Sequence, residues 1–175
     1  MLTISLLLIG CIDKEEEKDD TEETEEEASE FAEIGPMNGM VNAHNEIRQE
    51  HGIQQDLIWD EYLAEEAKIW IEYLDQDLNC QMEHNWDSPL GENLFWASYM
   101  TTATEVVQAW ASEEQYYDYD SNSCQAGEMC GHYTQIVWED TERVGCAMME
   151  CSNGSGFIWM CNYDPAGNWQ GEKPY

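Results

Sequence analysis

"CGHYTQIVWEDTERVGC", residues 130–146, decides how the second half of the chain folds, because it opens into the first of three short apolar runs. These runs are rich in aromatic and β-branched residues, and polar stretches separate them: TQIVWED (134–140), VGCAMMEC (144–151) and FIWMCNY (157–163). The pattern predicts antiparallel strands joined by tight turns. The first run follows His132, which fills a core or faces a cleft depending on what surrounds it.

The preceding part of the chain has a helical pattern. Apolar residues at helical spacing predict helices near 37–51, over 61–78, and from a cap at Thr102 or Thr104 to about Tyr119. Residues 79–98 are interpreted as an irregular loop with a short extended segment near Leu94. Helices followed by a small sheet indicate an α+β domain in which the sheet packs against the helices.

The charge of the chain is strongly negative. The formal net charge is −32, and residues 13–33 hold 13 acidic residues and two lysines, a net of −11, which leaves −21 for the rest. Such an acidic stretch buries too little apolar surface to fold, so residues 11–35 are predicted to be a disordered tether. Nucleic acid and anionic membrane surfaces would repel this protein and are not expected as partners.

The N-terminus has the pattern of an export signal. Residues 1–10 are apolar but too short to span a bilayer. They end in Leu-Ile-Gly before Cys11, which resembles a bacterial lipoprotein box with Cys11 as the lipidated residue. We therefore expect an extracytoplasmic protein, lipid-anchored to a bacterial membrane or secreted, with one folded domain over 36–175 and membrane contact only through the anchor.

Without Cys11, six cysteines remain: Cys80, Cys124, Cys130, Cys146, Cys151 and Cys161. An even number in an exported chain predicts three disulfides and an oxidising compartment. Six cysteines can pair in about fifteen ways, and the spacing alone does not choose among them. A zinc site built from these cysteines is disfavoured, because the chain has no CxxC pair.

Two of the four histidines, His84 and His132, lie in loops rich in small, polar and acidic residues. Two imidazoles with two carboxylates could bind a divalent cation such as zinc or transfer protons. On the third predicted helix, Glu113 falls on the apolar face together with Trp110, so its carboxylate is expected to point inward. The sequence contains no HExxH helix, GxSxG elbow or phosphate-binding glycine loop.

Four motifs in order resemble the CAP superfamily of cysteine-rich secretory proteins, antigen 5 and pathogenesis-related proteins of class 1. GHYTQIVWEDTERVGC (131–146) and FIWMCNYDPAGNW (157–169) are similar to its two signatures, GENLFWAS (91–98) to its Gly-Glu-Asn-Leu segment, and AHNEIRQEHG (43–52) to its opening helix. The resemblance covers about residues 38–175 and is greatest to the plant class-1 type.

The resemblance implies an α-β-α sandwich, with a small antiparallel sheet between helical layers, and the plant-type pairing of cysteines. That pairing joins Cys80 to Cys151, Cys124 to Cys130 and Cys146 to Cys161.

It also implies a cleft with a tetrad that binds zinc or another divalent cation in the family: His84, Glu92, Glu113 and His132. His44 belongs to the opening-helix motif and is expected to be structural. His51 is expected to be a surface residue at the helix end.

By resemblance, we expect a non-enzymatic, extracytoplasmic module that binds an apolar small molecule such as a lipid or sterol, with a divalent-cation site in the cleft. One alternative is a metal-dependent hydrolase or peptidase that uses the tetrad. The serine nearest to it in sequence, Ser88, has no sequence feature of an activated nucleophile. Another is a defence or protein-interaction module. Residues 165–175 are similar to a signalling peptide released by plant members.

Overall fold

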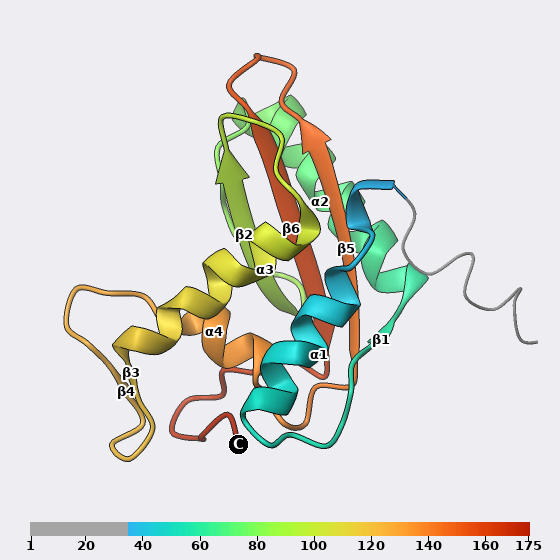
Figure 1. The fold of residues 1–175 in the computed structure, drawn as a ribbon. Coiled ribbons are helices and arrows are strands. Elements are labelled where there is room, and N and C mark those ends of the chain that lie inside the picture. The colour runs from blue at the N-terminus through green and yellow to red at the C-terminus, as the bar shows by residue number, and fades with distance from the viewer. Residues whose placement is uncertain (1–34) are drawn as a thin grey trace, which may run out of the picture.

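A four-stranded sheet with helices on both faces is the centre of the computed structural model, which describes residues 35–175 (Figure 1). The strand order is β1 (Ile58–Trp59), β5 (Arg143–Glu150), β6 (Phe157–Asp164) and β2 (Gly91–Ala97). All neighbours are antiparallel except the two-residue β1, which runs parallel to β5. The predicted signal peptide, the lipidation of Cys11 and the tether up to residue 34 lie outside the described residues.

The helices form the two outer layers. Helix α2 (Glu61–Leu78) covers one face of the sheet, and α1 (Met40–Glu50), α3 (Ala103–Ala111) and α4 (Gly131–Ile136) cover the other (Figure 1). Side chains alternate between the two faces of the sheet along β6, so this strand contributes to a hydrophobic core on each face. Ile158 and Met160 pack with α2, whereas Trp159 and Tyr163 pack with α1 and α3. The predicted α-β-α sandwich is therefore confirmed. No helix among residues 35–175 is long and apolar enough to cross a membrane.

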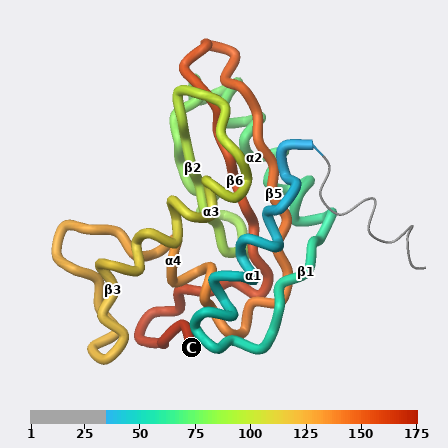
Figure 2. The backbone as a smooth tube through the Cα atoms, viewed as in Figure 1, coloured from blue at the N-terminus to red at the C-terminus, as the bar shows by residue number. Residues whose placement is uncertain are grey.

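Short elements complete the domain: η1 (Gly35–Met37), η2 (Ser112–Tyr116), β3 (Tyr117–Asp118) and β4 (Ser123–Cys124). Strands β3 and β4 pair as a hairpin that stands away from the main sheet, beside the C-terminal segment (Figure 2). Three disulfides join the same cysteines that the resemblance implies: Cys80–Cys151, Cys124–Cys130 and Cys146–Cys161.

Helix predictions succeeded where local signals were strong. The second helix has the predicted bounds, and Asp60 caps it by accepting from the backbone N–H groups of Tyr62 and Leu63 at 2.9 and 3.1 Å. Thr102 caps α3 through a capping box with Glu105. That helix is shorter than predicted, because it ends at Ala111 and continues as the 3₁₀ turn η2.

The extended segment expected near Leu94 is the seven-residue strand β2. The strand predicted over 134–140, by contrast, is wrong. These residues begin inside α4, whose last four residues are all buried. A six-residue helix is unstable by itself, so its β-branched residues are held helical by contacts with the rest of the domain.

Buried Arg48 provides one of these contacts. From α1, its guanidinium donates to the carbonyls of Gln55, Ile136, Trp138, Glu139 and Thr141, at 2.6 to 3.3 Å. Burial lowers the pKa of Arg48 to about 10, so the side chain stays protonated at neutral pH. A delocalised cation with five donors can satisfy these carbonyls at a place that water does not reach.

We expect Arg48→Met to lower the free energy of unfolding by at least about 3 kcal/mol, because several buried carbonyls lose their donors. Urea denaturation of the described domain measures the loss. Arg143→Met is the matched control: Arg143 pairs with Asp60 and Asp164, but its side chain is 41% exposed and its ion pairs are screened by water, so a much smaller loss is expected. Equal losses in the two variants would contradict a special role for Arg48.

Candidate functional site

A cleft of about 430 Å³ opens between the loop after α2, the start of β2, α4 and the segment after β6. His84, Glu92 and His132 line it, together with Gln135 from α4. An added Cβ at Gly91, beside Glu92, would lie 2.2 Å from Gln135 Oε1, so the Gln135 amide, which accepts from the backbone N–H of Gly167, would have to move. The close approach of β2 and α4 therefore shapes this wall.

Glu113 of η2 orients His132. The Glu113 carboxylate accepts from His132 Nδ1 at 2.6 Å and from the backbone N–H of His132 at 2.9 Å. It also accepts from the backbone N–H of Tyr133 at 3.3 Å, so it caps the first turn of α4. Burial raises the pKa of Glu113, but the hydrogen bonds and charge of His132 and the backbone donors outweigh it, and the net shift is downward.

Glu92 has the same relation to His84. Its Oε2 accepts from His84 Nδ1 at 3.0 Å and from the backbone N–H of Asn85 at 3.0 Å. The Glu92 side chain is only 5% exposed, and its Oε1 has no hydrogen-bond partner within residues 35–175. A buried carboxylate oxygen without a donor favours a ligand that brings positive charge or a proton.

Both pairs fix the histidine tautomer. A carboxylate accepts, so Nδ1 of each imidazole carries the hydrogen, and Nε2 of each neutral ring keeps its lone pair. Neither Nε2 has a hydrogen-bond partner among the described residues. A carboxylate behind Nδ1 is also the usual arrangement behind a histidine that binds a metal.

A buried chain of hydrogen bonds positions the backbone of His132. Asn93, next to Glu92 in β2, donates to the His132 carbonyl and to the Tyr163 hydroxyl, each at 3.1 Å. His44 Nδ1 donates to the Met40 carbonyl at 2.7 Å, so its Nε2 accepts from the Tyr163 hydroxyl at 2.8 Å. His44 is fully buried and therefore structural, as expected.

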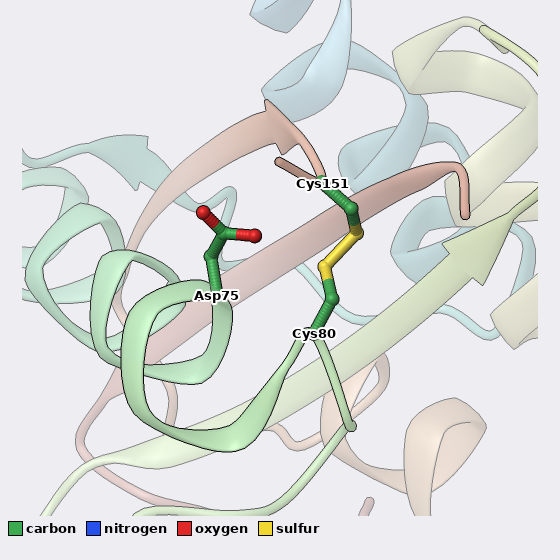
Figure 3. Close-up of side chains that lie close together, drawn as sticks. All are labelled: Asp75, Cys80 and Cys151. Atoms are coloured by element: carbon green, nitrogen blue, oxygen red, sulfur yellow. A yellow bond between two sulfur atoms is a disulfide. The ribbon is translucent and has the colours of Figure 1, made fainter. Parts of the chain in front are cut away.

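The four predicted residues thus form two pairs rather than one cluster. Among the described residues, the only group whose three ligand atoms lie within 4.8 Å of one another is Asp75, Cys80 and Cys151 (Figure 3). It does not fit a metal, because the two sulfurs form a disulfide and Asp75 Oδ1 already accepts from the backbone N–H of Ser152.

His51 is the residue that differs from the sequence interpretation. His51 does end a helix, but its side chain is only 15% exposed and contacts the hydroxyl groups of Tyr133 and Tyr175. Asn93 was not singled out, although its place directly after Glu92 in the Gly-Glu-Asn-Leu segment was a usable signal. Ser88 lies in the cleft, where its hydroxyl accepts from the backbone N–H of Leu90 at 3.2 Å rather than contacting an imidazole.

Comparisons with known proteins identify the family of the chain. Residues 41–163 match the model of CAP, the cysteine-rich secretory protein family. Pathogenesis-related protein 1A of Nicotiana tabacum is 45% identical over 136 residues, 77% of this chain and 78% of that protein. Pathogenesis-related protein PR-1 of Medicago truncatula is 49% identical over 120 residues, 68% of each chain.

Solved structures share the fold. NaASP2 with Zn²⁺ has a TM-score of 0.61 at 24% identity, covering 78% of this chain and 82% of that one. Venom allergen-like protein 4 of Schistosoma mansoni has a TM-score of 0.59 at 26% identity, covering 78% of this chain and 91% of that one.

The burial of His44 predicts a pH dependence of stability. Burial, with the charge of Arg48, lowers the His44 pKa from 6.5 to about 4, and the Met40 carbonyl only partly opposes this. The unfolded chain therefore takes up a proton as the pH falls below 6.5, while the folded chain does not until about pH 4. Stability contributed by neutral His44 is complete above pH 6.5 and is lost toward pH 4.

We expect the stability gap between the wild type and His44→Gln to narrow by about 3 kcal/mol from pH 7 to pH 4. Urea denaturation of both proteins at several pH values measures it, and the titration of the many carboxylates cancels in the difference. A gap that stays constant over this range would mean that folding does not lower the His44 pKa.

Proposed function

The chain belongs to the cysteine-rich secretory protein (CAP) family, and we propose that it is a secreted, defence-type binding module whose cleft binds one divalent cation between His84 and His132. The secreted, defence-type role rests on the family: its relatives are pathogenesis-related proteins, and three disulfides require an oxidising compartment. The cation site is argued from the two histidine–glutamate pairs of the cleft. A lipid anchor at Cys11 stays a prediction, which mass spectrometry of the mature N-terminus tests.

One observation carries the cation site: each cleft histidine donates Nδ1–H to a carboxylate, and its Nε2 has no partner within residues 35–175. Two imidazole nitrogens suit zinc and similar borderline cations, and waters or a ligand would complete the coordination. Glu92 and Glu113 would act by orienting the rings and increasing their basicity. Because one structural neighbour is NaASP2 with Zn²⁺, zinc is the first ion to test.

We expect calorimetric titration of the domain with zinc to show one micromolar site that is lost in His84→Ala/His132→Ala. Glu92→Gln/Glu113→Gln should weaken it by about 10- to 100-fold, because each histidine loses the carboxylate acceptor that orients it. The control Glu50→Gln/Asp77→Asn removes two exposed carboxylates from α1 and α2 and should leave the site unchanged. Weak, multiple binding that persists in the histidine variant would refute the proposal.

Lipid binding is the second candidate, and an apolar groove of about 330 Å³ favours it. The groove lies between η1, α2 and β5, and Met37, Ile71, Met148 and Met149 supply much of its lining. Methionine side chains adapt to flexible apolar ligands. The groove is separate from the histidine cleft, so the two proposals can be tested independently.

We expect the domain to take up a fatty acid or sterol, and Met149→Glu to weaken uptake by at least about tenfold, since the ligand would meet a carboxylate. Met100→Glu is the control, because Met100 is 53% exposed and does not line the groove. Absence of uptake by the wild type, or equal loss in both variants, would exclude this groove as a lipid site.

Hydrolysis is the remaining alternative for the histidine cleft. It would use the same two histidines with a metal-bound water, because the Ser88 hydroxyl has no base beside it within residues 35–175. A peptide-substrate screen that compares the wild type with His132→Ala distinguishes it: activity that survives the substitution would place catalysis outside this cleft.

A further inference from the structure

A second cavity, of about 370 Å³, lies between the β3–β4 hairpin and the C-terminal segment. We call it the hairpin pocket. The hairpin and the loop after it line the pocket with Tyr117, Asn122 and Glu128, and the C-terminal segment lines it with Trp169 and Glu172; Thr134 and Trp138 also contribute. It shares a wall with the histidine cleft at Cys130, Gly131 and Asn168.

Hydrogen bonds fasten the two sides of this pocket together. Asn122 of the hairpin donates to the Glu172 carbonyl at 2.8 Å and accepts from the Tyr117 hydroxyl at 2.7 Å. The Cys124–Cys130 disulfide closes the loop that follows the hairpin. The pocket is therefore preformed by links between segments far apart in the sequence, rather than being a gap between loose loops.

An exposed aromatic ring and two carboxylates that are unpaired within the described part of the chain are the groups left for a ligand. Trp169 is 60% exposed, and its Nε1 donates to the Ala166 carbonyl at 2.9 Å, which fixes the position of the indole. Glu128 and Glu172 line the pocket with exposed side chains, and among the described residues neither carboxylate has an ion pair or hydrogen bond.

The other polar groups of the pocket are already occupied. Thr134 donates to Asn168 at 2.6 Å, Asn168 donates to the Gly131 carbonyl, and Ser123 is paired with Ser121. A sugar, which needs several free donors and acceptors, would find few here. A bare metal ion is also disfavoured, because the pocket gathers no three ligand atoms within 4.8 Å of one another in the described part of the chain.

We propose that the hairpin pocket binds a polyamine, in which ammonium groups are joined by methylene chains. Carboxylates and the face of an indole both attract ammonium groups, and the indole also covers methylene groups. The net charge of −21 outside residues 13–33 raises the local concentration of cations around the domain. Two carboxylates in one small pocket favour a ligand with more than one charge.

Titration of the domain with spermidine at about 150 mM salt, where diffuse attraction is largely screened, tests the proposal. We expect one site, weakened about tenfold or more in Glu128→Gln/Glu172→Gln and several-fold in Trp169→Ala. Trp169→Phe should retain part of the affinity. The control Glu50→Gln/Asp77→Asn removes the same formal charge elsewhere and should bind like the wild type.

A second readout is the indole N–H resonance of Trp169, which we expect to shift on titration in the wild type and in the zinc-site variant His84→Ala/His132→Ala. Equal weakening in the control and pocket variants would overturn the proposal, because attraction would then be non-specific. Binding of a lysine-containing tripeptide as tight as that of spermidine would also overturn it, since the pocket would then recognise protein side chains.

Discussion

The buried guanidinium of Arg48 donates to carbonyl groups on both sides of the chain turn that follows α4. Its charge has no carboxylate within hydrogen-bonding distance among the described residues, so backbone dipoles provide all of its direct partners there. Burying a cation in this way is costly unless every donor is used. That requirement fixes the path of residues 136–141, and with it the end of α4 and the start of β5.

The candidate site depends on the same short helix. Glu113 holds the first turn of α4 and Arg48 holds its last turn and the residues beyond, so a helix too short to persist alone has partners at both ends. The carboxylate that satisfies the helix N-terminus also sets the His132 tautomer. One group therefore contributes to folding and to the chemistry of the cleft.

Elements that are fixed by contacts between residues close in sequence could be predicted, and elements that are fixed by distant contacts could not. The second helix was predicted with its correct bounds, because its cap and apolar stripe are local in sequence. The inward carboxylate at Glu113 was also found from helical periodicity, although the residue lies in a 3₁₀ turn. Residues 134–140 were misassigned, because β-branched residues favour a strand locally and the partners that make α4 helical come from elsewhere in the chain.

The pairing of each cleft histidine with its own glutamate also could not be predicted from the sequence around each residue. Nothing in the spacing of His84 and His132 shows that each contacts its own glutamate, and the family resemblance supplied the four residues without their geometry. The Asn93 link to His132 depends on β2 lying beside α4 at residue 91, where glycine leaves the Gln135 amide in its place.

Strand β2 carries Glu92 and Asn93 in succession, so their side chains leave opposite faces of the sheet: one orients His84, and the other reaches Tyr163 and the His132 carbonyl. Pairing with β6 sets Glu92 opposite Asn162 and Asn93 opposite Cys161. A slip of one residue would exchange the two faces and disable both halves of the cleft together. The register of β2 against β6 therefore couples the His84 side of the cleft to the His132 side, although His84 lies in loop 79–90 and His132 lies in α4, far along the chain.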